Sequence, residues 1–141
     1  MVRLVQSPQE REQALAIRMR VFVEEQGVPA HLEIDDHDQA AVHWLAYQDG
    51  QAVATARLVR YSDHQGKVGR VAVLPDWRSA GWGREVMNEI HRWAGDQPFQ
   101  EIILDAQVEV IAFYEKLGYQ AQGEVFEDCG ILHRRMVRWL A

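Results

Sequence analysis

One segment constrains the fold of this 141-residue chain more than any other: an apolar strand, a glycine-bearing turn and an amphipathic helix that follow one another without a gap. The strand is expected to end at Pro75, and apolar residues recur at helical spacing from Trp82 to Gly95. Gly81 and Gly83 lie in the first turn of that helix, where each glycine costs about 1 kcal/mol relative to alanine. Either a ligand that approaches the backbone closely or tight packing of the helix would explain them.

The turn favours an anionic ligand, because the first N–H groups of a helix are unpaired and its N-terminus carries a partial positive charge. Arg78 and Arg84 flank the two glycines and add to this preference. The dinucleotide-binding pattern G-x-G-x-x-G is excluded, since Val86 stands at the position of its third glycine. The phosphate-binding P-loop is excluded as well, because its glycine-lysine-hydroxyl sequence occurs nowhere in the chain. The pattern R-x-x-G-x-G after a strand is what remains.

The rest of the chain predicts a mixed sheet with helices on its faces. Strands are expected at 2–5, 40–47, 51–61, 68–74, 101–106, 119–126 and 131–140, and helices at 9–27, 82–95 and 110–117. The resulting order is β-α-β-β-β-α-β-α-β-β, in which hairpin-connected strands precede α-crossovers. A chain of this length suits one domain, so residues 1–141 are interpreted as a single α/β domain with a mixed, mostly antiparallel sheet.

Composition excludes several classes of protein. The longest apolar run, Val110 to Tyr114, is far shorter than the ~20 residues of a membrane helix, and the first eight residues lack the apolar core of a signal peptide. Cys129 is the only cysteine and the six histidines have no metal-ligand spacing, so we expect neither a disulfide nor a metal. The net charge of −6 disfavours binding to phosphate backbones. We therefore expect a cytoplasmic protein that binds neither nucleic acid nor membranes.

The glycine-bearing turn resembles the pyrophosphate-binding motif of the GNAT superfamily of acetyl-CoA-dependent N-acetyltransferases. A second segment, Phe113-Tyr114-Glu115-Lys116-Leu117-Gly118-Tyr119, is similar to the F-Y-x-K-x-G-F/Y signature of that superfamily. Four further stretches, at 21–29, 33–38, 43–45 and 130–136, look like the ElaA-like branch of the family. The matching segments follow one another in the right order over nearly the whole chain, which is far more specific than any single motif.

The resemblance implies that the protein uses acetyl-CoA as its acetyl donor. The pantetheine arm is expected to add like a strand beside Val71, Ala72 and Val73, where two strands diverge in the family and where Gly69 is compatible with a bulge. The pyrophosphate is expected on the turn made of Arg78, Ser79, Ala80, Gly81, Trp82, Gly83 and Arg84. Gln107, Phe113 and Tyr114 complete the expected cofactor contacts, although Gln107 departs from the asparagine that many family members carry near this position.

The resemblance also implies a role for Tyr114, since the family often uses a tyrosine there to protonate the departing CoA thiolate. A phenol is a suitable general acid for that step. The alternative is a core tyrosine packed beside Phe113 and Leu117. Because Phe113 already fills the apolar position, we favour the catalytic role. For the whole protein, the competing hypothesis is an acyl-CoA sensor or interaction module that kept the fold without turnover.

An acidic segment, residues 24–38, is the expected acceptor site, since it holds six carboxylates and no Lys or Arg. Residues 57–84, by contrast, hold six basic residues and two acidic ones, so the chain looks polarised between a cationic acceptor and an anionic cofactor. Carboxylates can bind an ammonium and accept its proton, and His133 is a further candidate base. The alternatives are a solvated acidic loop and a structural histidine. The candidates for base or acceptor binding are Glu33, Asp35, Asp38 and His133, with Glu24, Glu25 and His43 as further acceptor contacts.

The implied reaction is direct attack of a primary amine, on a small molecule or a peptide, at the acetyl thioester in a ternary complex. Cys129 and His133 do not fit a nucleophile and its base, because no glycine-rich oxyanion element adjoins Cys129. The family normally transfers the acetyl group without a covalent enzyme. Exposed strand edges in this fold often pair, so a homodimer is the oligomer to test.

Overall fold

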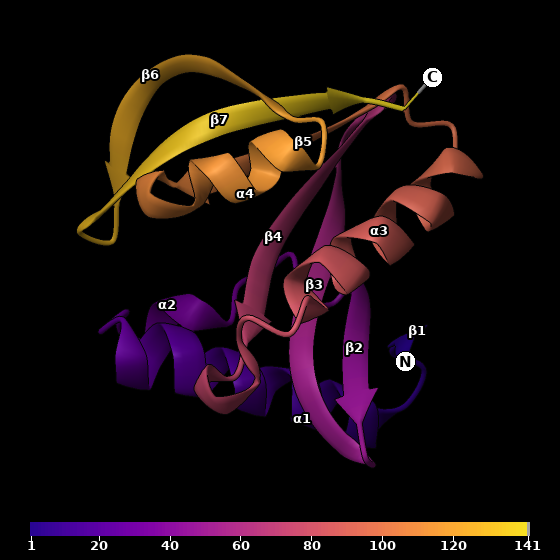
Figure 1. The fold of residues 1–141 in the computed structure, drawn as a ribbon, viewed down its shortest axis with the longest axis vertical. Helices are drawn as coiled ribbons and strands as arrows, with labels where there is room; N and C mark the ends of the chain where they lie inside the picture. Colours follow the sequence, from indigo (N-terminus) through magenta and orange to yellow (C-terminus); the bar gives the residue numbers. More distant parts are fainter. Residues whose placement is uncertain (141) are drawn as a thin grey trace.

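The computed structural model describes residues 1–140, so Ala141 of the predicted domain lies outside the described residues. Seven strands form one sheet in the order β1-β2-β3-β4-β5-β7-β6 (Figure 1). Its elements are β1 (Val2–Leu4), α1 (Pro8–Arg18), the π-helix η1 (Met19–Glu25), α2 (Ala30–Glu33), β2 (Val42–Gln48), β3 (Gln51–Ser62), β4 (Gln65–Val73), the 3-10 helix η2 (Pro75–Trp77), α3 (Trp82–Gly95), β5 (Glu101–Gln107), the 3-10 helix η3 (Val108–Val110), α4 (Ile111–Lys116), β6 (Gln120–Asp128) and β7 (Ile131–Trp139). Strands β4 and β5 pair in parallel and the other neighbours are antiparallel, which confirms the predicted mixed, mostly antiparallel sheet.

The two faces of the sheet are covered by different helices (Figure 1). The apolar stripe of α3, which includes Met87 and Ile90, is buried with Trp44, Tyr114 and other side chains in the larger core. On the opposite face, α1 and η1 pack against β2, β3 and β4 through a smaller cluster of Ala14, Ile17, Val21, Leu45 and Ala72. Helices therefore lie on both faces, as the sequence predicted. None of the helices in residues 1–140 has the length and apolarity needed to span a bilayer.

The first helical segment follows its capping signals. The Ser7 hydroxyl accepts a hydrogen bond from the Glu10 N–H at 3.1 Å, and Pro8 occupies the first helical position. From Met19 the helix continues as the π-helix η1, and the backbone turns away at Gly27 with a φ of 77°. The predicted helix over 9–27 is thus confirmed in extent, although its second half is π-helical, a conformation often found at functional sites.

The turn after β3 is not where the sequence placed it. The predicted strands at 51–61 and 68–74 leave Gly66 in the turn between them, but β3 runs to Ser62 and β4 begins at Gln65, so Gly66 lies inside a strand. A Cβ at Gly66 would approach side-chain atoms of Ile102 and Leu58 to 3.2 Å. Packing within the core, rather than a turn conformation, therefore explains this glycine.

Strands β4 and β5 pair only at their beginnings. The register joins Gln65–Val68 to Glu101–Leu104, and beyond these residues the strands separate (Figure 1). On its other side β4 carries a bulge: Thr55 pairs with Ala72 but Arg57 pairs with Gly69, so two residues of β4 oppose one of β3. Arg70, within the bulge, has a φ of 54°. The bulge expected near Gly69 is confirmed, and the separation opens a gap in the sheet between two strands that are otherwise neighbours.

Candidate active site

The edge of β4 that faces the opening presents backbone groups. The Leu74 N–H donates to the Val53 carbonyl of β3 at 2.9 Å. Because backbone groups alternate in direction along a strand, those of the preceding residue, Val73, point away from β3 and into the opening. Val71 lies within the bulge, while the side chain of Ala72 is buried against the α1 layer. The backbone groups of Val73 are therefore not paired with β5, and its carbonyl accepts a hydrogen bond from the Arg78 side chain instead.

The glycine-bearing turn leads into an uncapped helix. Gly81 is the N-cap of α3 with a φ of 88°, a left-handed conformation that favours glycine, and no side chain caps the helix. The first N–H groups of this 14-residue helix are thus free to meet an anion. Arg84 is exposed, its guanidinium folds back to within 3.6 Å of where a Cβ on Gly81 would lie, and it forms no ion pair within residues 1–140. The turn is open and positively charged.

Gly83 has a different explanation from Gly81. A Cβ at Gly83 would lie 3.2 Å from Cζ of Phe113 on α4. The second glycine therefore allows α3 to pack closely against α4, which is the packing alternative considered from the sequence. Tyr114, the next residue of α4, packs its ring against that of Phe113. Trp82 anchors the turn from the other side, since its indole N–H donates to Gln48 Oε1 at 2.9 Å.

Arg78 is held by partners within the protein. Its Nη1 and Nη2 atoms donate to the two carboxylate oxygens of Glu25, each at 2.7 Å, and its Nε donates to the Val73 carbonyl at 3.0 Å. The hydrogen bonds from Arg78 hold the pKa of the Glu25 carboxyl below its usual range. A residue expected to bind pyrophosphate is thus paired with one expected to contact the acceptor.

Tyr114 is a buried tyrosine whose hydroxyl is not completely enclosed. The ring packs edge-on against Phe113 and Tyr119, with centroids 4.9 and 5.8 Å away, and burial raises the pKa of the phenol. No hydrogen bond from its hydroxyl is formed within residues 1–140, yet no buried side-chain polar atom in that range lacks a partner. The hydroxyl oxygen is therefore not completely enclosed, although Tyr114 as a whole is only 7% exposed. The phenol stays protonated at neutral pH, as a proton donor requires, but burial makes it a weaker acid than an exposed tyrosine.

A buried chain of polar groups that sequence reasoning missed supports Tyr119. The Tyr119 hydroxyl lies 2.7 Å from Nε2 of His91, and the Arg138 guanidinium contacts Nδ1 of the same ring. Because arginine can only donate, Nδ1 accepts and Nε2 carries the proton. Burial, reinforced by the charge of Arg138, lowers the pKa of His91 to about 4. In the sequence, His91 follows Ile90 of the apolar stripe of α3, and this position was the one indication that the histidine is buried.

The acidic segment is folded onto three arginines. Arg18, 1% exposed, donates to Glu33 at 2.8 Å and to Asp38 at 2.7 Å. Arg57 donates to Asp35 and Asp38 at 2.7 and 2.9 Å. Arg70, in the bulge of β4, completes the set with ion pairs to Glu33 and Asp35 at 2.9 and 3.2 Å. We call these six residues the three-arginine network: Arg18, Arg57, Arg70, Glu33, Asp35 and Asp38.

The network changes the interpretation of the acidic segment. Hydrogen bonds from Arg57 lower the pKa of Asp35, and those from Arg18 and the Asp35 N–H lower that of Asp38 even though burial opposes the shift. Both carboxylates therefore have little tendency to accept a proton. The expected polarisation between two segments is wrong for Arg57 and Arg70, because they pair with the very carboxylates that were assigned to a cationic acceptor.

Comparison with known proteins agrees with this geometry. A family model described as an acetyltransferase (GNAT) domain matches residues 6–140. This chain belongs to the GNAT acetyltransferase family. A Bacillus subtilis protein named as an acetyltransferase is 37% identical over 140 residues, which cover 97% of this chain and 95% of that protein. The crystal structure of an N-acetyltransferase from Lactobacillus plantarum has 29% identity and a TM-score of 0.93, with 100% and 98% of the two chains covered. Escherichia coli ElaA has 28% identity and a TM-score of 0.86, with 98% and 99% covered.

The GNAT fold and the resemblance to this superfamily are thus confirmed, and the protein is an acyltransferase. In this GNAT acetyltransferase, α3 follows the part of β4 that does not pair with β5, and α4 packs against the start of α3 through Phe113. Among the acceptor candidates, His43 is 5% exposed and its Nε2 lies 2.9 Å from the Asp38 carbonyl, so it lies beneath the three-arginine network. Burial lowers the pKa of His43. Glu24 is exposed.

Two expected residues of this GNAT protein lie side by side where β5 ends: Gln107 on β5 and His133 on β7. Gln107 pairs with His133 of β7 in the sheet register, and its side-chain amide binds that of Gln26. His133 stacks on Phe126 with ring centroids 5.9 Å apart, and its Nδ1 lies 2.8 Å from the Ile131 carbonyl. Since a carbonyl can only accept, Nδ1 carries the proton and Nε2 keeps its lone pair. Within residues 1–140 no group of three or more His, Cys, Asp or Glu is arranged to hold a metal ion.

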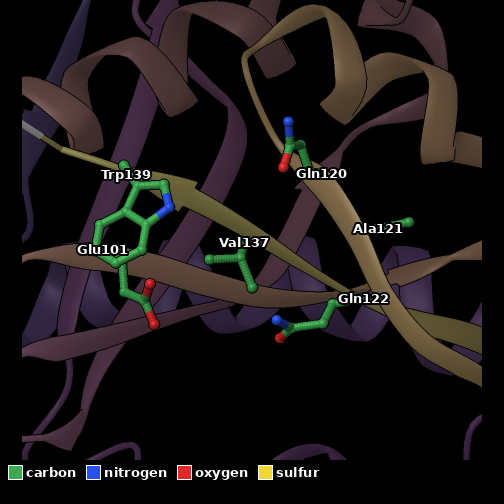
Figure 2. Close-up of a pocket in the computed structure, with 6 residues that line it drawn as sticks. All are labelled: Glu101, Gln120, Ala121, Gln122, Val137 and Trp139. Carbon is green, nitrogen blue, oxygen red and sulfur yellow. The ribbon is translucent and has the colours of Figure 1, made fainter.

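A pocket on the GNAT sheet lies away from this opening. Figure 2 shows the residues that line it, on the outer face of β5, β6 and β7: Glu101, Gln120, Ala121, Gln122, Val137 and Trp139. Glu101 pairs with Gln65, at the end of β5 where β4 and β5 are still joined. The pocket therefore does not communicate with the separation of these strands, and we assign it no part in acyl transfer.

Proposed function

We propose that this GNAT acyltransferase is an N-acetyltransferase that moves an acetyl group from acetyl-CoA to a primary amine by direct attack in a ternary complex. One observation carries the proposal: β4 and β5 stop pairing after Val68 and Leu104, the uncapped N-terminus of α3 follows β4, and α4, which carries Tyr114, packs against that N-terminus. The free strand edge, the helix N-terminus and the tyrosine match the three parts of the donor, an amide-bearing arm, a diphosphate and a thioester.

The residues present fit the donor. The N–H groups at the start of α3 and the guanidinium of Arg84 would hold the diphosphate. The backbone of Val73 would bind the pantetheine amides, and the Arg78 Nε that now occupies its carbonyl would have to move or share it. Gly81 keeps the turn free of a side chain where the diphosphate would approach.

Acetyl-CoA supplies the acetyl group as a thioester. In the transfer, a bond forms between the amine nitrogen and the acetyl carbon while the C–S bond breaks. Backbone N–H groups in the β4 bulge, near Val71, would donate to the carbonyl oxygen as negative charge develops there. Tyr114 would then give its hydroxyl proton to the departing thiolate sulfur.

The attacking amine must first lose a proton. His133 is the better candidate base, because its Nε2 lone pair is free whereas Asp35 and Asp38 have lowered pKa values. Glu33, Asp35 and Asp38 instead serve to hold the loop after α2 against the sheet. Glu24 remains the exposed carboxylate for contact with the acceptor. The cytoplasmic location, the homodimer and the absence of nucleic-acid and membrane partners stay predictions of the sequence.

Binding of the donor is tested by thermal denaturation with and without acetyl-CoA. We expect a rise in Tm that increases with ligand concentration. Gly81→Ala, at a left-handed position, should reduce the rise, whereas Gly95→Ala should not, because a Cβ there meets nothing within 4 Å. No stabilisation of the wild-type protein at millimolar acetyl-CoA would reject the proposal.

Turnover is tested by release of CoA thiol across a panel of primary amines. Tyr114→Phe should lower kcat by about 10²-fold and leave the Kd for acetyl-CoA unchanged, since the variant loses only a proton donor. Tyr61→Phe, at a tyrosine that is 53% exposed, is the matched control and should keep full activity. Equal kcat for wild type and Tyr114→Phe would remove the assigned role. Tight binding of acetyl-CoA with no thiol release for any amine would favour the sensor hypothesis.

A further inference from the structure

Two consecutive residues at the end of η1 reach opposite sides of the opening. Glu25 binds Arg78, in the turn that follows β4. Gln26 forms a reciprocal amide pair with Gln107, the last residue of β5: Gln107 Nε2 donates to Gln26 Oε1 at 2.9 Å, and Gln26 Nε2 donates back at 3.4 Å. The end of η1 therefore links the turn after β4 to the end of β5, across the region where these two strands are separated.

The amide pair lies on one particular face of the opening. Along β5, Ala106 is buried in the core on the α3 side, so the next side chain, Gln107, points to the α1 side. Gln26 reaches it from η1, which packs against β4 on that same side. The glycine-bearing turn, by contrast, leads into α3, and Tyr114 lies on α4. The amide pair thus crosses the separation of β4 and β5 on the α1 side of the sheet, opposite the face that α3 and α4 cover.

We infer that the Gln26–Gln107 amide pair is the floor of the acyl slot and limits the length of the acyl chain that the enzyme accepts. The inference rests on the proposed function, because it places the acyl end of the donor inside the opening. An acetyl group adds one methyl beyond the thioester carbonyl. A longer chain extends further through the sheet and must displace the pair.

The chemistry of the Gln26–Gln107 pair suits a steric limit on the acyl chain rather than a part in proton transfer. Each half-buried amide satisfies the other, so the pair presents no free charge and no lone pair of basic strength. Displacing it breaks two hydrogen bonds and leaves both amides in a partly dry site. We therefore expect the wild-type enzyme to discriminate against butyryl-CoA relative to acetyl-CoA by about tenfold or more.

The experiment compares acyl-CoA donors of increasing length: acetyl, propionyl, butyryl and hexanoyl. The Kd of each is measured by calorimetric titration, which needs no acceptor, and kcat/KM is measured with any amine found active. Gln26→Ala should lower the butyryl-to-acetyl ratio of Kd about tenfold and raise the butyryl-to-acetyl ratio of kcat/KM about tenfold. Gln122→Ala, at an exposed glutamine of β6 that pairs with neither residue, should leave both ratios at their wild-type values.

The outcomes separate this inference from the proposed function. An unchanged ratio in Gln26→Ala, or a wild-type enzyme that binds and transfers butyryl and acetyl groups equally well, would overturn the floor while leaving acyl transfer intact. Failure of the wild type to bind any of the four donors would instead overturn the proposed function. Gln107→Asn shortens the partner by one methylene and provides a milder variant if Gln26→Ala is poorly folded. It should shift each ratio in the same direction.

Discussion

Two sets of ion pairs hold the same acidic segment, residues 24–38, and they differ in burial and in the number of charged partners. In the three-arginine network each arginine contacts two carboxylates, and the centre is buried, with Arg18 1% and Glu33 2% exposed, while Arg70 and Asp35 at its edge are 26% and 30% exposed. In the Glu25–Arg78 pair, the two side chains are 35% and 40% exposed, and each has one charged partner. The buried set cannot exchange its partners without leaving a charge in the protein interior. The exposed pair can do so, because water solvates whatever it releases.

The difference gives the two sets different roles. The buried network fixes the loop after α2 to the sheet and ties it to the β4 bulge through Arg70. The exposed pair holds Arg78 of the glycine-bearing turn, and an anion of higher charge can displace Glu25 from it. Stability should therefore respond to the first set and affinity for the donor to the second.

The largest expected effect comes from the centre of the buried network. Arg18→Met should reduce the free energy of unfolding by about 3–5 kcal/mol, because it leaves Glu33 and Asp38 with uncompensated charge. Urea denaturation measures the loss. Arg11→Met, at an exposed arginine of the same helix, is the control and should change stability by less than about 0.5 kcal/mol. Similar losses for the two variants would show that the network contributes little.

A pH series separates the network from the buried His91. Because the folded pKa of His91, about 4, lies below its ordinary value of 6.5, the unfolded chain binds more protons between these values. This contribution is complete above pH 6.5 and falls by about 3 kcal/mol as the pH drops toward 4. The lowered pKa values of Asp35 and Asp38 keep the network charged over that window, so its loss begins only below about pH 4.

The variant His91→Gln removes the titrating ring and should flatten the stability profile between pH 4 and 6.5, as measured by urea denaturation at each pH. A residual slope of the same sign is expected from His43, whose pKa is also lowered. If the profile of His91→Gln matched that of the wild type, His91 would not be the group that titrates.

A smaller effect, on the affinity for acetyl-CoA, is expected at Arg84, the arginine of the glycine-bearing turn that forms no ion pair within residues 1–140. Arg84→Ala should weaken acetyl-CoA binding by about tenfold, because one charge-assisted contact is lost. Calorimetric titration gives the Kd, and raising the salt concentration should narrow the gap to the wild type. An unchanged Kd would mean that the backbone N–H groups of α3 bind the diphosphate without Arg84.

The smallest effect is expected in the exposed pair itself. Glu25→Gln should alter the free energy of unfolding by less than about 1 kcal/mol, as is usual for an exposed ion pair. It should tighten acetyl-CoA binding by a few fold, because Arg78 no longer has to leave a carboxylate. Weaker binding in Glu25→Gln would instead assign Glu25 the task of positioning Arg78 for the donor.

The elements that could be predicted from the sequence are those with local signals. Ser7 and Pro8 predict the start of α1, Asp49 and Gly50 adopt the positive φ values of a two-residue hairpin, and the apolar stripe predicts α3. The assignment of Gly66 to a turn failed because a glycine needed for packing has the same sequence signature as one needed for a turn.

The candidate site was predictable where a motif is continuous in the chain and unpredictable where it depends on distant partners. The turn from Arg78 to Arg84 and the segment around Tyr114 were identified because their continuous motifs resemble those of the GNAT superfamily. Which arginine each carboxylate meets depends on pairs separated by 15 to 37 residues, such as Arg18 with Glu33 and Arg70 with Glu33. Counting charges along the chain therefore predicted separate acidic and basic surfaces, whereas in the folded protein most of these acidic and basic side chains pair with one another.

The tip of the β6–β7 hairpin has a practical consequence. Cys129, the one thiol in the chain, is exposed there, and it lies near enough to Arg70 and Glu33 for their charges to influence its pKa. A fluorophore attached at this position would report on events beside the loop after α2. Partial burial and the neighbouring Asp128 carboxylate raise the pKa of the thiol, so labelling proceeds best in mildly alkaline buffer. The same group will consume one equivalent of any thiol reagent used to follow CoA release, and Cys129→Ser protein removes that background.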